Sequence, residues 1–315
     1  MNDTVLILST VAAIASGTTL VLVSVGEILA ERAGVMNLSL EGMVLMGAVT
    51  GFWGASATDN PWIGLVVAMI VGVAVSFVHA VLAVSFRVNQ IVSGLALFIL
   101  GTGLSAYIGE IGDTPLIRRP PPRDLGSVFP EAITDLPVVG PVLFGHDALV
   151  YISWLLVAGA SFYLFRTRRG LAARAVGEDP ATADAAGVSV ALTRYVHVLA
   201  GGALAGLAGG YLSVVLIGAW QQGFSGGLGW IAFAMVAFSG WRPWRALFAS
   251  YIFGGLSSLG LTFQLLDVPI PSDFLLMMPF VFTFLALVLI TSNPRLSRKL
   301  GAPAALSIPF RRESR

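Results

Sequence analysis

The sequence predicts an all-α fold: a polytopic bundle of helices that crosses a membrane several times. Hydrophobic residues make up 56% of the chain and charged residues only 11%, and the mean hydropathy is +0.86. A soluble domain carries about 25% charged residues. Apolar runs extend from one end of the sequence to the other. We therefore expect one integral membrane domain with about 8–10 membrane helices, since a crossing needs about 20 residues.

Nine apolar runs are the predicted helices. Most approach the length that a crossing needs, whereas Trp230–Gly240 is too short to cross alone. Between the first two runs, Gly26–Val35 is predicted to be a tight polar turn. In chain order the runs are Val5–Val25, Asn37–Ala55, Trp62–Val84, Ile91–Gly109, Tyr151–Phe165, Val196–Ile217, Trp230–Gly240, Ala246–Leu266 and Phe274–Thr291. Glycines in the sixth run, at 201, 202, 206, 209 and 210, predict that other helices approach it closely.

Two polar breaks interrupt the pattern and predict broken or re-entrant segments near residues 37–56 and 218–240. The first break includes Asn37, Glu41 and Gly42, and the second is the glycine-rich stretch 218–229. Non-helical backbone at membrane depth is tolerated only where it is buried in protein or lines a cavity. We therefore expect the breaks to lie along a path through the protein.

The stretch 166–195 is the one long polar insert with helix signals. It holds five of the eighteen Lys and Arg residues. Asp179 suits an N-cap, Pro180 the first helical position and Gly187 a left-handed end, so the sequence predicts a two-turn helix about 10 Å long. Two turns are unstable alone in water. Either the rest of the protein or a partner must hold this helix; a solvated connector is the alternative.

The positive charges predict an orientation. If 166–195 is cytosolic and the runs alternate, 15 of the 18 Lys and Arg residues lie on the cytosolic side, as membrane proteins prefer. The N-terminus is then outside and the C-terminus cytosolic. Residues 1–293 are the membrane domain, 110–148 an irregular proline-rich extracytoplasmic loop, and 294–315 a cytosolic basic tail.

Several kinds of chemistry are excluded or disfavoured. The chain has no cysteine, which excludes thiol catalysis, disulfides and cysteine metal sites. Its only lysine, Lys299, does not lie in a phosphate-binding loop, and His79, His146 and His197 are far apart. We expect no catalytic residue, metal or cofactor in this chain, so ATP-driven transport would need another chain as the ATPase. The net charge of +1 gives no indication of nucleic acid binding.

Glu41 is the only carboxylate that this assignment places inside an apolar run. An ionisable group there costs several kcal/mol unless it faces a cavity or finds a partner. Two interpretations are open: Glu41 lines the path, or it caps its own helix at the membrane interface.

The second break combines flat aromatic faces with amide groups, which suit a polar solute that carries a ring. An aromatic belt at the membrane surface is the alternative. Asn89 and Gln90, which open the fourth run, either satisfy the helix start or contact the solute. The predicted path residues are Asn37, Glu41, Gln90, Trp220, Gln221, Gln222, Phe224 and Trp230.

Three stretches together resemble the permease subunits of bacterial ABC importers of the branched-chain amino acid and ribose type, and among them most closely the nucleoside permeases. They are GEILAERAGVMNLSLEGMVLMGA, AVGEDPATADAAGV followed by the glycine-rich run, and GWRPWRAL. The resemblance extends from Gly26 to about Thr291. It implies an ATP-driven importer in the bacterial inner membrane. The implied partners are two cytosolic ATPase subunits or domains, a second and different permease, and an extracytoplasmic binding lipoprotein.

The resemblance also implies a coupling helix that the ATPase pushes. The residues it assigns to this role are Gly177, Glu178, Asp179, Pro180, Ala183, Ala186 and Gly187. The implied substrates are nucleosides or related sugars, with ribose-like sugars or branched-chain amino acids as alternatives. The rival hypothesis from the residues is a secondary carrier that is coupled to protons or Na⁺, with Glu41 as the titrating group.

Overall fold

The computed structural model describes residues 3–111, 115–119, 122, 125–265, 270–292 and 301–312. In this part of the chain all regular structure is helical, which confirms the predicted fold class. The α-helices are α1 (Asp3–Arg32), α2 (Leu40–Thr58), α3 (Pro61–Ala80), α4 (Gln90–Glu110), α5 (Glu131–Thr134), α6 (Ala148–Arg166), α7 (Arg168–Glu178), α8 (Pro180–Ala185), α9 (Val190–Tyr211), α10 (Leu228–Ser239), α11 (Pro243–Leu265) and α12 (Ser272–Ser292).

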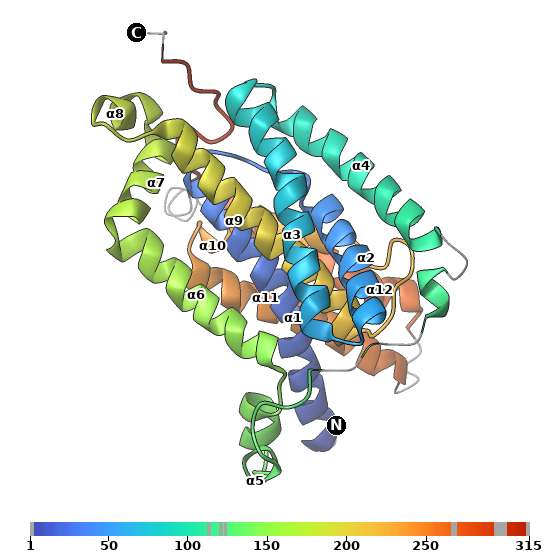
Figure 1. Ribbon diagram of the computed structural model, residues 1–315. Coiled ribbons are helices and arrows are strands. Elements are labelled where there is room, and N and C mark those ends of the chain that lie inside the picture. The colour runs from blue at the N-terminus through green and yellow to red at the C-terminus, as the bar shows by residue number, and fades with distance from the viewer. Residues whose placement is uncertain are drawn as a thin grey trace.

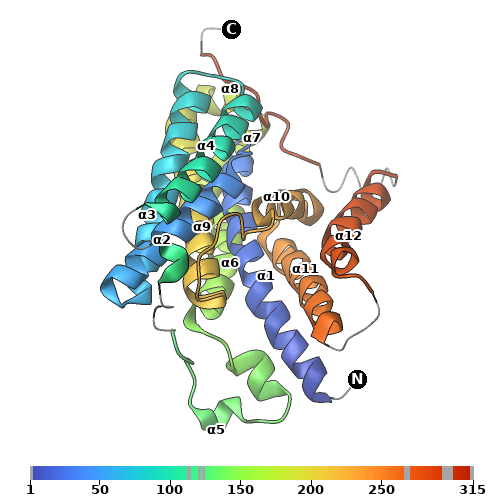
Figure 2. The ribbon, with the colours of Figure 1, turned by 90° about the vertical axis from the view of Figure 1, so that its right-hand side faces the viewer.

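Five helical segments in the described residues are long and apolar enough to cross a membrane. Two of them gain length because a π-helical turn continues α3 through Val81–Ser85 and α9 through Leu212–Leu216. The five are Leu6–Arg32, Pro61–Ser85, Gln90–Glu110, Ala148–Arg166 and Val190–Leu216. The bundle is completed by α2, α11 and α12, and by the shorter α10 (Figures 1 and 2).

Helix α9 occupies the centre of the bundle and packs against α1, α2 and α3. The predicted glycine stripe makes this possible. A Cβ on Gly206 would lie 2.2 Å from the Ala68 carbonyl oxygen, and one on Gly209 would lie 2.0 Å from that of Val44. Both distances are far inside van der Waals contact, so α9 approaches the backbones of α3 and α2 only because these positions lack a side chain.

The two ends of the bundle carry different elements (Figure 1). The short helices α7 and α8 and the described C-terminal residues 301–312 gather at one end, and the N-terminus and α5 lie at the other. Figure 2 shows α11 and α12 on the side of α1 that faces away from α3 and α4. In its described residues, the loop before α6 contains three short helical turns, Leu116–Arg118, α5 and Gly140–Phe144. Pro120 and Pro121 lie outside the described residues.

The prediction of a polar turn at Gly26–Val35 was wrong. Helix α1 runs without a break to Arg32, and the two carboxylates near its end, Glu27 and Glu31, are buried. The Trp241 indole N–H donates to Glu31 Oε2. Glu41 is therefore not the only carboxylate inside an apolar segment. The error arose because charged residues were taken to end a membrane helix, whereas here they lie one turn apart and bind partners within the protein.

The insert 166–195 forms two helices, and the sequence predicted only the second. Asp179 Oδ1 accepts hydrogen bonds from the backbone N–H groups of Ala181 and Thr182 at 3.0 Å. Pro180 is the first residue of α8, and Gly187 has φ +86°. This confirms the predicted capped helix of about two turns. The additional helix is α7, whose start is capped by Thr167.

Candidate functional site

Residues 33–39 form a non-helical stretch between α1 and α2, called the unwound segment below. Side chains from neighbouring helices bind its backbone. The Met36 N–H donates to Gln90 Oε1 at 2.8 Å, and the Met36 carbonyl oxygen accepts from His79 Nε2 at 3.0 Å. Since a carbonyl oxygen only accepts, His79 carries its proton on Nε2. His79 Nδ1 then accepts from Ser93 Oγ at 3.0 Å.

The second half of the unwound segment is held in the same way. Glu27 Oε1 accepts from the Asn37 N–H at 2.8 Å. Asn37 Oδ1 in turn accepts from the backbone N–H of Ser39 at 3.0 Å and from its hydroxyl at 2.5 Å. Helices α1, α3 and α4 thus supply the partners that a helix would have found in its own backbone. Such replacement is what allows irregular backbone at membrane depth.

Glu41 joins the two predicted breaks. It lies in the first turn of α2 and is buried. Its Oε1 accepts from Ser225 Oγ at 2.5 Å and from the Gly227 N–H at 3.2 Å, and its Oε2 accepts from the Gly229 N–H at 2.6 Å. These donors belong to the second break and the start of α10. Glu41 therefore caps α10 and not its own helix. The free N–H groups and the dipole at the start of α10 favour a carboxylate there.

This junction lies well inside the bundle. Gly42 packs against Leu97 and Phe98, about 10 Å along α4 from its start. From the junction, the 12 residues of α10 cover about 18 Å and reach Gly240. The Gly240 carbonyl oxygen accepts from Arg32 at the end of α1. Both α2 and α10 therefore begin at an interior point beside one carboxylate and run away from it.

A cavity of about 480 Å³ lies beside this junction. Phe224, Ser225 and Gly226 of the second break form part of its wall, and α1, the π-helical continuation of α9, α10, α11 and α12 supply the rest. Its lining is mostly apolar, with hydroxyls from Ser16, Thr19, Ser225 and Ser257. The volume lies within the range of about 300–1,000 Å³ that small-molecule sites occupy.

The predicted path residues are distributed over different surroundings. Asn37, Glu41 and Gln90 converge on the unwound segment and the junction. Phe224 borders the cavity, and Gln221 and Gln222 are exposed. Their role in a solute path stays a prediction.

The two tryptophans of the second break pack against helix α4. Trp220 is buried over Gly109 near the end of α4, in a cluster with Val49, Phe52 and Leu116. Trp230 makes an edge-to-face contact with Phe98, with ring centroids 5.3 Å apart. These contacts hold the second break against the same helix that positions Gln90.

Helix α8 displays part of its surface and buries the rest. Ala183 packs with Val176 and Val190, whereas Glu178, Asp179, Ala186 and Gly187 are exposed. Hydrogen bonds from the Thr182 hydroxyl, and then from the Thr182 and Ala181 backbone, lower the pKa of Asp179. The N-cap is therefore ionised at neutral pH. A groove of about 400 Å³ lies between α7 and α8, and Leu171 is exposed beside it. Four alanines and Thr182 line it together with the larger Arg168, Leu171, Glu178, Asp179 and Val188.

Gly177 connects α7 directly to the start of the unwound segment. A Cβ at this position would lie 2.3 Å from the Arg32 carbonyl oxygen and 3.3 Å from the Gly34 nitrogen. The end of α7 therefore touches the turn that leads into the unwound segment, with no side chain between them.

The sequence analysis missed four residues of this site. Glu27 and His79 bind the unwound segment, Ser225 binds Glu41, and Arg194 donates to the Ala33 carbonyl oxygen at 3.3 Å. Glu27, His79 and Arg194 share one signal that could have found them: a polar residue within or at the end of a long apolar run. Ser225 carries no such signal, because serine is common in glycine-rich loops.

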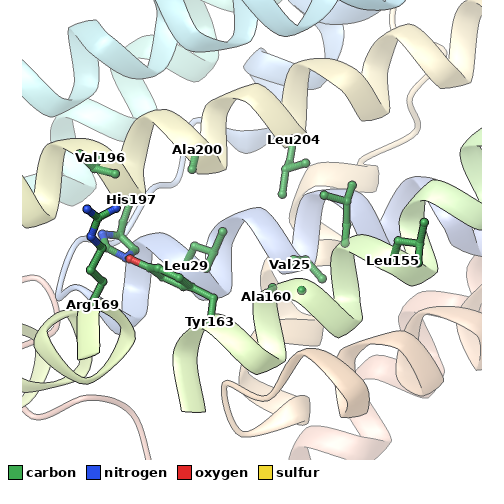
Figure 3. Close-up of a pocket in the computed structure, with 12 residues that line it drawn as sticks. Val25, Leu29, Leu155, Ala160, Tyr163, Arg169, Val196, His197, Ala200 and Leu204 are labelled. Carbon is green, nitrogen blue, oxygen red and sulfur yellow. The ribbon is translucent and has the colours of Figure 1, made fainter. Parts of the chain in front are cut away.

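A second cavity lies on another face, between α1, α6 and α9 (Figure 3). Its volume is about 380 Å³ and its walls are mainly apolar. At one end Tyr163, His197 and Arg169 lie together (Figure 3), and Tyr163 Oη lies 3.0 Å from His197 Nε2. It shares no lining residue with the cavity beside Ser225, so the two are separate features.

The fold and the junction define a multi-pass membrane protein with two broken helices that meet inside the bundle, an arrangement found in solute transporters. Comparison with known proteins identifies the family. The model for the permease component of the branched-chain amino acid transport system matches residues 9–290. The chain belongs to this family, as the sequence motifs indicated.

Named relatives agree with this assignment. A putative glucose ABC transporter permease of Haloferax volcanii is 41% identical over 257 residues, which are 82% of this chain and 78% of the relative. A guanosine ABC transporter permease of Bacillus subtilis is 34% identical, covering 92% of each chain. A nucleoside ABC transporter permease of Lactococcus lactis is 31% identical, covering 86% of this chain and 88% of the relative. No solved structure gives a significant match.

Family membership places the chain among the membrane-spanning permease subunits of ABC transporters. In such transporters ATP hydrolysis belongs to partner ATPases, and the permease works with them and with a substrate-binding protein. The predicted family and the predicted class, the permease of an ABC transporter, are therefore confirmed. The number of partners, the orientation of the termini and the roles of single residues stay predictions.

Proposed function

We propose that the chain is a permease of an ATP-driven importer for nucleosides or related sugars, with α8 as its coupling helix. The observation that carries the proposal is the direct contact from α7–α8 to the unwound segment. Gly177, three residues before the first residue of α8, touches Arg32 and Gly34. A displacement of α8 by an ATPase is passed to residues 33–39 because closely packed backbones move together.

The same displacement reaches the interior junction. The unwound segment leads into α2, whose Glu41 holds the start of α10. The backbone of Met36 and Asn37 is bound by side chains and not by the backbone of a helix, so it can change conformation without breaking helix turns. We propose that this lets α2 and α10 rearrange around the cavity beside Ser225 as the solute passes.

The substrate class follows from the relatives and is compatible with the cavity. Two of the relatives are named for nucleosides or guanosine and one for glucose. The cavity combines apolar walls, Phe224 and several hydroxyls, which suits a solute that has both a flat ring and polar groups. Ribose-like sugars share the polar groups, whereas a branched-chain amino acid would bring two charges for which the lining offers no charged partner among the described residues.

We further propose the complete assembly: two ATPase subunits or domains, a second and different permease, and an extracytoplasmic binding lipoprotein at the inner membrane of the cell. The N-terminus and the loop 110–148 would then face outward, and α7, α8 and the tail 294–315 would face the cytosol. This orientation is supported by the grouping of α7, α8 and residues 301–312 at one end of the bundle (Figure 1). Residues 293–300 and 313–315 of the tail lie outside the described residues.

The test is Ala186→Arg in the complete transporter. Ala186 is exposed on α8 and lines the groove with α7, so a long charged side chain there obstructs the contact with an ATPase. We expect uptake to be abolished while the amount of protein in the membrane is unchanged. Ala57→Arg, at the exposed outer end of α2, is the matched control and should transport normally. Normal uptake by the Ala186→Arg variant would overturn the coupling role of α8.

A second experiment distinguishes the proposal from an ion-coupled carrier that uses Glu41. The purified chain alone in liposomes should show no uptake under a proton or sodium gradient. Uptake that appears without an ATPase would favour the carrier.

A further inference from the structure

The C-terminal residues 301–312 lie across the end of the bundle that carries α7 and α8 (Figure 1). We call this segment the strap. It is far in sequence from every element that it touches. Ala305 is buried, and Leu306 packs against a cluster that includes Ile28, Leu164 and Trp241. A segment that only trailed in solvent would not bury these side chains.

One set of contacts fixes the strap to α7 and α8. The Ala305 N–H donates to the Gly177 carbonyl oxygen at 2.9 Å, and the Ala304 N–H donates to Glu178 Oε2 at 3.1 Å. Arg312 Nε pairs with Asp184 Oδ2 of α8 at 3.0 Å. Phe310 packs against the cluster that contains Ala183. The ion pair is exposed on the arginine side and contributes little, so the attachment depends on the backbone bonds and the apolar contacts.

A second set of contacts fixes the strap to the unwound segment. The Ser307 N–H donates to the Gly34 carbonyl oxygen at 3.3 Å. Arg194 of α9, which is almost fully buried, donates from Nη1 to the Ile308 carbonyl oxygen at 3.1 Å and from Nε to that of Ala33 at 3.3 Å. One guanidinium therefore holds the strap and the start of the unwound segment together.

We propose that the strap is part of the coupling device: it moves as one body with α8 and carries the displacement of α8 to residues 33–39. This inference rests on the proposed role of α8. It is supported by the order of contacts along the strap, in which Ala304, Ala305, Phe310 and Arg312 bind α7–α8 while Ser307 and Ile308, between them, bind the unwound segment and Arg194. The strap thus adds a second connection between α8 and the unwound segment to the direct one through Gly177.

The opposite device would use the same segment as a clamp. In that case the strap would hold α8 away from the ATPase and would have to detach before transport. The two devices differ in what happens when strap and α8 cannot separate.

A reversible cross-link distinguishes them. Because the chain has no cysteine, the pair Asp184→Cys and Arg312→Cys gives a unique site for a reducible bis-thiosulfonate linker. Each single substitution is the control, and reduction restores the starting state. In the complete transporter with ATPase and binding protein, the strap should tolerate the linker, with uptake within about twofold of the unlinked protein. Uptake that is blocked by the linker and restored by reduction would establish the clamp and overturn the proposal.

Removing the strap tests whether it is needed. A chain ending at residue 302 loses every contact described above, whereas a chain ending at residue 312 keeps them and is the control. We expect the solute imported per ATP hydrolysed to fall about tenfold in the shorter chain, within the usual range of coupling energies, while ATP hydrolysis continues. If the shorter chain does not accumulate, Ala305→Glu is used, which displaces the strap at its buried centre at full length.

An unchanged ratio of solute to ATP in the variants without a seated strap would overturn the proposal. Failure of the proposed function is a different result: it appears as normal uptake by Ala186→Arg in a chain whose strap is intact.

Discussion

Replacing Glu41 by glutamine removes one of the two acceptor oxygens that join α2 to α10. In the native chain these oxygens receive hydrogen bonds from Ser225, Gly227 and Gly229. A glutamine can offer its oxygen to one side only, and its NH₂ group then faces the other. If NH₂ faces Ser225, the hydroxyl can turn and accept, but the Gly227 N–H loses its acceptor. If NH₂ faces Gly229, that buried N–H loses its acceptor.

Either arrangement of the glutamine leaves one backbone N–H without a partner. Leaving a buried donor unsatisfied costs about 1–3 kcal/mol, and the remaining bonds weaken because the acceptor is no longer charged. At about 2 °C per kcal/mol for a chain of this size, the melting temperature should fall by roughly 2–6 °C. Uptake should fall as well, because the start of α10 is no longer held at the cavity.

The assay is thermal unfolding in detergent together with ATP-driven uptake in liposomes. Glu110→Gln is the matched control, because Glu110 is exposed at the end of α4 and its substitution should change neither quantity. A Glu41→Gln protein with native melting temperature and native uptake would refute the idea that this carboxylate organises the junction. A lower melting temperature with native uptake would limit Glu41 to a structural role.

Two further substitutions test the connection between α8 and the unwound segment. Gly177→Ala places a Cβ 2.3 Å from the Arg32 carbonyl oxygen. Since both groups belong to rigid backbone, we expect the free energy of unfolding to fall by about 1–3 kcal/mol and uptake per ATP to decrease. The control for both measurements is Gly103→Ala, whose added Cβ meets nothing within 4 Å. Asp179→Ala removes the N-cap of α8 and should make the amides of 181–186 exchange several-fold faster in hydrogen-exchange measurements, whereas Asp179→Asn, an equally good cap, should not. The cap lowers the Asp179 pKa below its ordinary value of 3.8, so the stabilisation of α8 by the ionised cap is complete above that value and is lost only as the pH falls through the lowered pKa. After correction for the intrinsic pH dependence of exchange, the protection of α8 in the wild-type chain should therefore be constant from pH 5 to 8. A change within that range would contradict this assignment.

The parts of the fold that depend on local chemistry could be predicted from the sequence. Asp179, Pro180 and Gly187 define α8 because a cap, a first-turn proline and a left-handed glycine each act within a few residues. The glycines of α9 indicated close packing for a similarly direct reason: a residue without a side chain leaves room for another backbone. The second break followed from its glycine-rich polar sequence. The first break was predicted near 37–56 and lies at 33–39, whereas Glu41 and Gly42 belong to the continuous helix α2.

What could not be predicted depends on partners distant in sequence. Glu27 and Glu31 were predicted to lie in a turn, because no residue next to them in the sequence indicates that Asn37 and Trp241 bind them. Glu41 had two interpretations, and the structure shows a third, in which it caps a helix that begins almost two hundred residues later. The strap belongs to a tail that the sequence analysis described only as basic, and only the folded chain shows that its backbone binds Gly34 and Gly177.

The distribution of hydrogen bonds explains why motion would concentrate at the junction. Within α1, α3, α4 and α9 the backbone groups bind one another, and a change of conformation would break several bonds at once. In residues 33–39 and 225–229 several backbone groups instead bind the side chains of Glu27, His79, Gln90 and Glu41, and a side chain can follow a shift of its partner by changing rotamer. Because the strap and Gly177 meet the chain at the start of the first of these stretches, a force on α8, in the coupling role that we propose, would act where the resistance of the bundle is lowest. The glycine contacts of α9 with α2 and α3 would then keep the rest of the bundle together during a movement of α2 and α10.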